Sequence, residues 1–256
     1  MDIYQEIVDI KNRGDDAALA TIIYAGGSAP REEGAKMLVR ADGSIMGTIG
    51  GGNLENNVIE EALGVIKSGR PKHLEYRLKE GDEVGMICGG DVAVFIEPIL
   101  YTPTLFICGG GHIGLALAKI GKIVGYRIVI IDDRPEFASK ERFPEAEETI
   151  VDNPGSAFSR LEVDRSGYIA IVTHGHKDDE AALEGALGTG ACYIGMIGSR
   201  SKVKAVFSHL IAKGFSRERL DRVHSPIGLD INAQTPEEIA VSIMAEIIAV
   251  RRLPAK

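Results

Sequence analysis

The stretch Ile107-Cys-Gly-Gly-Gly-His-Ile-Gly114 has the glycine spacing of a turn that joins a β-strand to a helix and holds a pyrophosphate. An apolar run, 104–108, precedes it, and a helical pattern that starts near His112 follows it. Glycines at 109, 111 and 114 permit a tight turn, close approach of the backbone to an anion, and close packing of helix on strand. The alternative is that these glycines only serve packing.

An acidic residue stands where a nucleotide-binding fold needs one. Asp132 lies 23 residues past Gly109, at the end of the next apolar run. In dinucleotide-binding domains an acid at this place hydrogen-bonds a ribose hydroxyl. The spacing therefore predicts a ribose contact for Asp132 and an anion contact for the helix that begins at His112.

From Leu105 onward, apolar strands alternate with amphipathic helices, which is typical of a parallel sheet with helical crossovers. The expected strands contain TLFIC, RIVIID, EETIVD, GYIAIVT and ACYIGMI, and the expected helices lie near 112–124, 178–188, 200–213 and 236–252. We predict a Rossmann-like, doubly wound domain over 103–256.

The preceding residues, 1–102, indicate a separate mixed α/β domain. Helical spacing is evident near 2–13 and in 53–67, where Asn53 is the expected cap. Asp42-Gly43 between two apolar runs predicts a hairpin, and the segment YTPT is the expected linker to the second domain.

Charge and composition exclude several classes of protein. The net charge of −8 argues against a general nucleic-acid binder, because phosphate neutralisation needs clustered Lys and Arg. No apolar run approaches a membrane span, and the first residues lack the apolar stretch of a secretory signal. We therefore expect a cytoplasmic protein with no membrane partner.

The bend THGHKDDE, residues 173–180, follows the fourth expected strand. In the usual doubly wound order this bend adjoins the first strand at the ligand crevice, so His174 and His176 would approach His112. Histidines beside carboxylates can bind a metal, move protons or contact a ligand. The alternative is a solvated loop in which the acids Asp178 and Asp179 favour the start of the next helix.

Three other loops are candidate anion sites. In the segment GSRSK, Ser199 and Arg200 stand at a helix start. In the first domain, Gly50-Gly51-Gly52 could form a concavity of backbone amides, and Arg31 lies in another glycine-rich loop. A capped helix, or a tight crossover from hairpin to helix, would explain the same residues without a ligand.

Three cysteines cannot form a disulfide framework. Cys108 and Cys192 adjoin apolar strands and are expected in the core. Cys88 lies in the glycine-flanked segment GMICGGDV, where a thiolate could be a nucleophile, a sulfur carrier or a soft-metal ligand. A small residue in a bend is the alternative.

The motifs GSAPREEGAKMLV, IGGGNLE, CGG, IDDRPEF, YIGMIGSRSK and VHSPIGLDINAQTPEEIAVSI occur in this order along nearly the whole chain. In this set the sequence resembles the XdhC/CoxI family, the accessory factors of xanthine dehydrogenase and related molybdenum hydroxylases. The resemblance implies a chaperone that binds molybdenum cofactor and delivers it to a molybdoenzyme apoprotein. In some members a cysteine desulfurase supplies a sulfido ligand.

For individual residues, the resemblance makes Cys88 a candidate contact to molybdenum or its sulfur. Gly50–Gly52 and Arg31 would border that site, while the turn at Gly109 would hold the phosphate or dinucleotide part of the cofactor. We also expect a homodimer.

The main rival is an NAD(P)-dependent oxidoreductase that uses the same glycine turn and Asp132. The sequence has no Tyr-x-x-x-Lys pair for hydride transfer, since neither Tyr168 nor Tyr193 has a lysine four residues on. A nucleotide sensor without turnover is a second rival. The sequence itself establishes no turnover.

Overall fold

The described chain forms two compact units. The computed structural model describes residues 2–27, 29–78 and 90–252, and the first unit ends at Tyr101 where the second begins at Thr102. We name them the N-terminal domain and the Rossmann domain. Within the described residues, none of the helices combines the length and apolar character that a membrane span requires.

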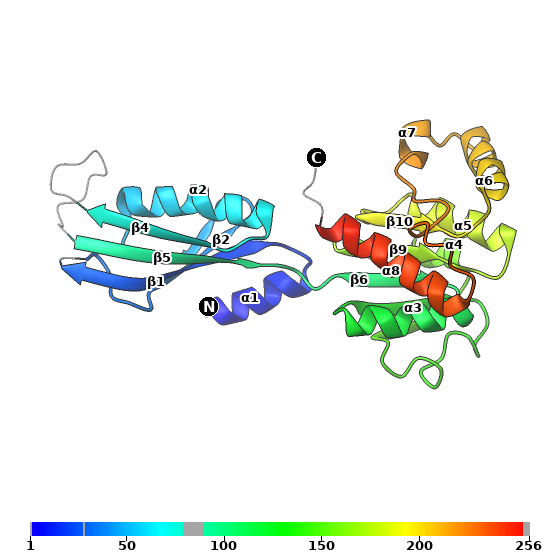
Figure 1. Cartoon of the computed structure of the whole chain (residues 1–256), viewed down its shortest axis with the longest axis horizontal. Coiled ribbons are helices and arrows are strands. Elements are labelled where there is room, and N and C mark those ends of the chain that lie inside the picture. The colour runs from blue at the N-terminus through cyan, green and yellow to red at the C-terminus, as the bar shows by residue number, and fades with distance from the viewer. Residues whose placement is uncertain (1, 28, 79–89, 253–256) are drawn as a thin grey trace. The chain divides into compact units, whose positions relative to one another are not determined.

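Over its described residues, the N-terminal domain is an antiparallel sheet with two helices, coloured from blue through cyan to blue-green in Figure 1. Its strand order is β3-β2-β1-β5-β4. The elements are α1 (Ile3–Asn12), β1 (Ala17–Gly27), β2 (Lys36–Arg40), β3 (Ile45–Gly47), α2 (Gly52–Ser68), β4 (Lys72–Leu78) and β5 (Gly90–Ile99). The hairpin predicted at Asp42-Gly43 joins β2 to β3 and is confirmed.

The two helices cover opposite faces of this sheet because successive side chains of β1 point to opposite sides. Ala18, Ala20 and Ile22 pack in one cluster with the buried face of α2. Ala17 and Leu19 pack instead in a smaller cluster that contains α1. The domain therefore has its main core under α2.

The Rossmann domain is a five-stranded sheet in which every strand pair is parallel. Its order is β10-β9-β6-β7-β8, so the first strand of the domain lies between the second and the fourth. The elements are β6 (Thr104–Cys108), α3 (His112–Ile123), β7 (Arg127–Asp132), β8 (Glu148–Val151), α4 (Pro154–Ala157), β9 (Gly167–Ile171), α5 (His176–Ala186), β10 (Tyr193–Met196), α6 (Arg200–Ala212), α7 (Arg217–Leu220) and α8 (Pro236–Arg252).

Helices cover both faces of this sheet, as predicted. One core cluster joins residues of α3 and α8 to the strands, and the other joins residues of α4, α5 and α6 to the opposite face. The switch in strand order falls between β6 and β9, where doubly wound folds bind ligands. We call this side of the sheet, where β6, β9 and β10 end and α3, α5 and α6 begin, the carboxyl edge (Figure 1).

One cysteine prediction is confirmed and one is wrong. Cys108 is buried at the end of the central strand β6, and burial together with nearby Asp179 raises the pKa of its thiol. Cys192, predicted in the core, is exposed. It precedes β10, which lies at the edge of the sheet, and the side chains of its neighbours Ala191 and Tyr193 point inward instead.

Candidate functional site

Packing requires three glycines of the turn between β6 and α3. Gly109 has φ +114°, and a Cβ there would lie 2.9 Å from the Thr173 Cα atom and closer to Val172. A Cβ on Gly110 would overlap the carbonyl group of Phe137, and one on Gly114 would overlap that of Gly109. These positions hold the turn against the residues that follow β9, against the segment after β7, and against its own helix.

Gly111 differs from its neighbours because packing does not require it. It caps the start of α3 with φ −66°, which any residue can adopt, and a Cβ there would have no heavy atom within 4 Å. Open space in front of a helix N-terminus is what a bound pyrophosphate needs. The packing alternative therefore explains Gly109, Gly110 and Gly114 but leaves Gly111 unexplained.

Asp132 ends β7, as predicted, but its carboxylate is used within the protein. It is 2% exposed. It accepts hydrogen bonds from the Gly110 amide at 2.8 Å and from Nε and Nη2 of Arg134 at 2.9 and 3.0 Å. Burial alone would raise its pKa, but the hydrogen bonds from Arg134 and Gly110 outweigh burial and lower it. Asp132 thus stays ionised and anchors the glycine turn, and its ribose contact stays a prediction.

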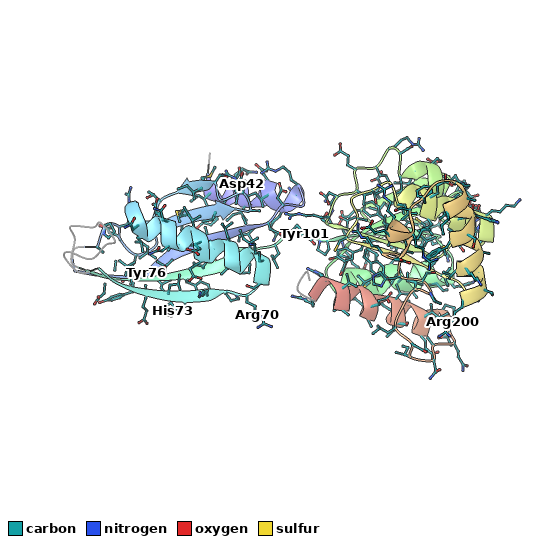
Figure 2. The ribbon with its side chains drawn as sticks, turned by 90° about the horizontal axis from the view of Figure 1, so that it is seen from above. Asp42, Arg70, His73, Tyr76, Tyr101 and Arg200 are labelled. Carbon is teal, nitrogen blue, oxygen red and sulfur yellow. The ribbon has the colours of Figure 1, made fainter. Side chains whose placement is uncertain are left out.

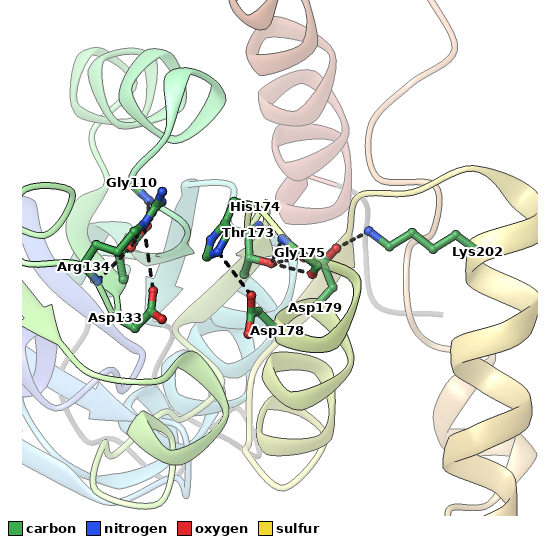
Figure 3. Close-up of polar contacts among 10 residues, drawn as sticks. Gly110, Asp133, Arg134, Thr173, His174, Gly175, Asp178, Asp179 and Lys202 are labelled. Carbon is green, nitrogen blue, oxygen red and sulfur yellow. Dashed lines mark hydrogen bonds and ion pairs between the residues drawn. The ribbon is translucent and has the colours of Figure 1, made fainter.

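The segment after β7 places further polar groups beside the turn. Asp133 is 48% exposed and lies 3.9 Å from Nε of Arg134 (Figure 3). The guanidinium of Arg134 stacks 3.7 Å above the ring centroid of Phe137, and Arg142 donates from Nε to the Gly110 carbonyl at 2.8 Å. Sequence spacing missed both arginines, although the acid-acid-arginine run in IDDRPEF was a local signal for the first.

The bend after β9 is tied down by a buried ion pair. Asp179, whose side chain is fully buried, accepts hydrogen bonds from the amide and hydroxyl of Thr173 at 3.2 and 2.6 Å. Its other oxygen pairs with Nζ of Lys202 from α6 (Figure 3). Thr173 also packs against Gly109, because a Cβ on that glycine would lie 2.9 Å from the Thr173 Cα atom. This ion pair therefore links the loops that follow β6, β9 and β10 at the carboxyl edge.

The histidines of the crevice are only partly described. His112 is the exposed first residue of α3, and the exposed His174 lies with Nε2 3.6 Å from Asp178 (Figure 3). The side chain of His176 lies outside the described residues. Among the residues that the structure describes, no group of three or more His, Cys, Asp or Glu side chains is arranged to hold a metal.

The loop GSRSK begins α6, but one of its two cations serves the protein interior. Ser199 caps the helix by accepting from the Lys202 amide at 3.3 Å. Lys202 itself pairs with Asp179. Arg200, labelled in Figure 2, is exposed and remains the cation of this loop that faces solvent.

In the N-terminal domain, the glycine loop before α2 is occupied by a side chain of its own helix. The Glu55 carboxylate accepts from the Thr48 hydroxyl at 2.5 Å and from the Ile49 amide at 3.1 Å. Burial would raise its pKa, but the Thr48 hydroxyl and the amides of residues 49–51 lower it on balance. The anion concavity expected at Gly50, Gly51 and Gly52 thus already holds a carboxylate.

The predicted cap of α2 is wrong. Gly51 is the cap, and Asn53 is the second residue of the helix. The physical reason is that Glu55 accepts from the amides before the helix, so the helix begins two residues earlier than predicted. Arg31 is exposed, and Pro30 before it packs against Gly50, so the two glycine-rich loops lie together. Cys88 lies outside the described residues.

A polar cluster on the α8 side of the sheet was not predicted. Glu246 accepts from the Tyr193 hydroxyl at 2.5 Å and from the Gly228 amide at 2.9 Å, and His224 Nδ1 lies 3.3 Å from it. Burial would raise the pKa of Glu246, but His224 and Tyr193 lower it. The segment VHSPIG is recognisable in the sequence, but its partner Glu246 lies on α8. No local sequence pattern indicates this contact.

Comparisons with known proteins place the chain in a family. The model of the XdhC Rossmann domain matches residues 105–247, more than half of the chain, and the model of the XdhC and CoxI family matches residues 10–77. The chain therefore belongs to the XdhC/CoxI family, and the resemblance seen in its motifs is confirmed.

Three relatives in the family are similar over most of this chain. YqeB of Escherichia coli K12 is 35% identical over 98% of the chain, which spans 46% of that protein's length. A probable xanthine dehydrogenase subunit of Bacillus subtilis is 23% identical, with 93% of this chain and 94% of that protein covered. The molybdenum cofactor insertion chaperone PaoD of Escherichia coli K12 is 25% identical, with 93% and 84% covered.

A solved structure has the same fold. A protein of Bacillus halodurans described as a xanthine dehydrogenase superposes with a TM-score of 0.55 at 24% identity. The alignment covers 98% of this chain and 96% of that one. The likeness supports the order of a mixed α/β domain followed by a Rossmann domain.

Proposed function

We propose that this protein is an accessory factor that binds molybdenum cofactor and delivers it to a molybdoenzyme of the xanthine dehydrogenase type. The observation that carries the proposal is the turn at Gly111. It presents open space at the start of α3, while the glycines around it are fixed by packing. The similarity to a molybdenum cofactor insertion chaperone and to a probable xanthine dehydrogenase subunit supports the same role.

The residues at the turn fit the anionic part of this cofactor. Molybdenum cofactor carries a phosphate or, in dinucleotide forms, a pyrophosphate joined to a nucleotide. A phosphate in front of Gly111 would meet the amides at the start of α3. The exposed carboxylate of Asp133 lies beside the same turn and suits ribose hydroxyls, whereas Asp132 holds Gly110 in place. We therefore propose the dinucleotide form as the ligand.

For the metal end of the cofactor we propose Cys88, on the strength of the family resemblance. A soft thiolate is a suitable partner for molybdenum or its sulfur. Arg31 and Gly50–Gly52 would border it in the N-terminal domain. A homodimer, a cytoplasmic location and a cysteine desulfurase as second partner complete the proposal.

A transfer experiment tests delivery. The protein is loaded with molybdenum cofactor and mixed with an apo molybdoenzyme of the xanthine dehydrogenase type, in the presence of a second protein that scavenges free cofactor. We expect the loaded protein to restore enzyme activity, while the same amount of free cofactor is captured by the scavenger. Equal activation by free and protein-bound cofactor would contradict a delivery role.

A pair of cysteine variants tests the metal end. Cys88→Ala should lower cofactor retention, while Cys192→Ala, which removes an exposed thiol elsewhere, should leave it unchanged. Loss in both variants, or in neither, would contradict the assignment of Cys88. If the protein instead bound NADH tightly and no cofactor, the proposal would give way to the oxidoreductase hypothesis.

A further inference from the structure

The motif VHSPIGLDINAQ forms one wall of a cavity whose lining does not include the turn at Gly111. The cavity has a volume of about 620 Å³. Its other wall is the loop that follows β10. The lining consists of residues 197–200, residues 226–233, Ile239 and Ser242. The cavity therefore lies at the carboxyl edge of the sheet, next to the last strand. We call it the β10 cavity.

Hydrogen bonds fix this wall in place. The Ile227 amide donates to the Met196 carbonyl at 3.1 Å, which holds the segment on β10. Ser242 of α8 donates from its hydroxyl to the Leu229 carbonyl at 2.5 Å, and the Leu229 amide donates back to the Ser242 carbonyl at 3.2 Å. A wall held at both ends is preorganised, so a ligand need not order it.

The Glu246 cluster fixes the bend in the same wall. Gly228 has φ +94°, which favours glycine, and a Cβ there would overlap the Ser242 hydroxyl. Its amide donates to Glu246, whose carboxylate also receives the Tyr193 hydroxyl. The buried polar groups of the motif therefore form hydrogen bonds within the protein that shape the wall. The proposed ligand contacts do not depend on these groups.

The lining has the character of a site for a flat, polar heterocycle. Leu229 and Ile231 are large apolar residues left 44% and 49% exposed, and Ile197 and Ile227 add to the same lining. Arg200 and Asp230 are its charged residues. A guanidinium donates to a ring carbonyl, and a carboxylate accepts from the adjacent N–H groups of an aminopyrimidinone edge.

The cavity lies within reach of a ligand that starts at the glycine turn. In the sheet, β9 separates β6 from β10. Two strand spacings amount to about 10 Å. A dinucleotide-type ligand spans the carboxyl edge in folds of this class, with its two halves on either side of the switch point. One half would then lie over β7, beside Asp133, and the other would extend toward β10.

We propose that the β10 cavity binds the pterin ring of the cofactor, with Arg200 donating to its ring carbonyl and Asp230 accepting from the N–H groups of its aminopyrimidinone edge. This inference rests on the proposed function, and it adds a second subsite to the glycine turn. The ring lies between apolar side chains, and the phosphate lies at Gly111. The carboxamide of a nicotinamide ring also offers a carbonyl and an N–H group, and the test separates the two sources.

The test measures retention of molybdenum cofactor by the full chain, read as the fluorescent pterin released on oxidation. Arg200→Gln should weaken retention about tenfold, the loss expected for one charge-assisted contact. Ile231→Trp, which fills the cavity from its exposed rim, should weaken it at least as much. Lys204→Gln is the matched control, because it removes an exposed charge one turn further along α6, outside the lining.

The outcomes separate this proposal from the proposed function. If the wild type and the cavity variants retained cofactor equally well while Gly111→Ala lost it, the β10 cavity would be refuted and the glycine turn would stand. If Arg200→Gln weakened binding of NADH but not of molybdenum cofactor, the ring would be a nicotinamide and the proposal wrong. A wild type that retained no cofactor would overturn both.

Discussion

Two alanine substitutions within one turn should separate binding from stability. Gly111→Ala places a Cβ in open space, at a residue whose φ of −66° suits alanine. Alanine at a compatible backbone position gains about 0.4–1 kcal/mol through the unfolded chain. Alanine is a poor helix cap, and this costs a similar amount, about 0.5–1 kcal/mol. We therefore expect a change in unfolding free energy within about 1 kcal/mol.

Gly114→Ala should behave in the opposite way. Its Cβ would lie 3.1 Å from the carbonyl carbon of Gly109, nearer still to its oxygen, and 3.3 Å from Cγ2 of Ile107. Helix propensity favours alanine by up to about 1 kcal/mol, but overpacking against backbone costs about 1–3 kcal/mol or more. The net expectation is a destabilised Rossmann domain.

Hydrogen exchange of the amides in β6 and β9 measures the unfolding free energy of the Rossmann domain separately from the N-terminal domain. Cofactor retention is measured on the same samples. Gly111→Ala should keep full exchange protection and lose at least tenfold in affinity, because its methyl group occupies the place of the phosphate. Equal protection in the two variants, or wild-type affinity in Gly111→Ala, would refute the roles given to these two glycines.

Three further predictions concern charges and thiols. Lys202→Met leaves the buried Asp179 carboxylate without its cation and should lower the free energy of unfolding by about 3–5 kcal/mol, measured by urea titration. Lys204→Met should change that free energy little, and equal effects of the two variants would contradict the role of the ion pair. The folded-state pKa of Glu55 is lowered, so the stability that its carboxylate contributes is present above the usual pKa of 4.5 and is lost as pH falls through the folded pKa. Glu55→Gln should therefore flatten the loss of unfolding free energy below about pH 5. The same dependence of stability on pH in the wild type and the variant would contradict this. A thiol reagent followed by mass spectrometry should modify Cys192 in the folded protein and leave Cys108 intact until unfolding, and early modification of Cys108 would contradict its burial.

The fold was predictable because its signals are local. The strand-turn-helix pattern around Gly109 and the alternation after Leu105 repeat over short stretches, and each is read from neighbouring residues. The parallel order of the Rossmann domain then follows from the few topologies that crossovers allow. The hairpin at Asp42-Gly43 is equally local, since the turn chemistry lies in two residues.

The contacts that the site residues make were less predictable, because their partners are remote in the chain. Spacing placed Asp132 at the end of its strand, but its occupation by Arg134 and the Gly110 amide depends on how the following segment folds back over the turn. The segment GSRSK was expected to form an anion site, but its lysine, Lys202, pairs with Asp179 on another helix.

The glycine loop of the N-terminal domain shows the same limit. Three consecutive glycines indicate exposed amides, yet Glu55 from the following helix fills the space that those amides surround. The acid was visible close to the loop, but sequence alone favours it equally as a partner of the helix dipole. Only the three-dimensional contact distinguishes the two.

The most direct test of the central claim is an equilibrium titration of the purified wild-type protein with molybdenum cofactor, with NADH as competitor and released pterin as the readout. We predict saturable binding of the cofactor that NADH does not displace at comparable concentration, and that Gly111→Ala weakens at least tenfold. No binding of the cofactor, together with tight binding of NADH, would contradict the claim.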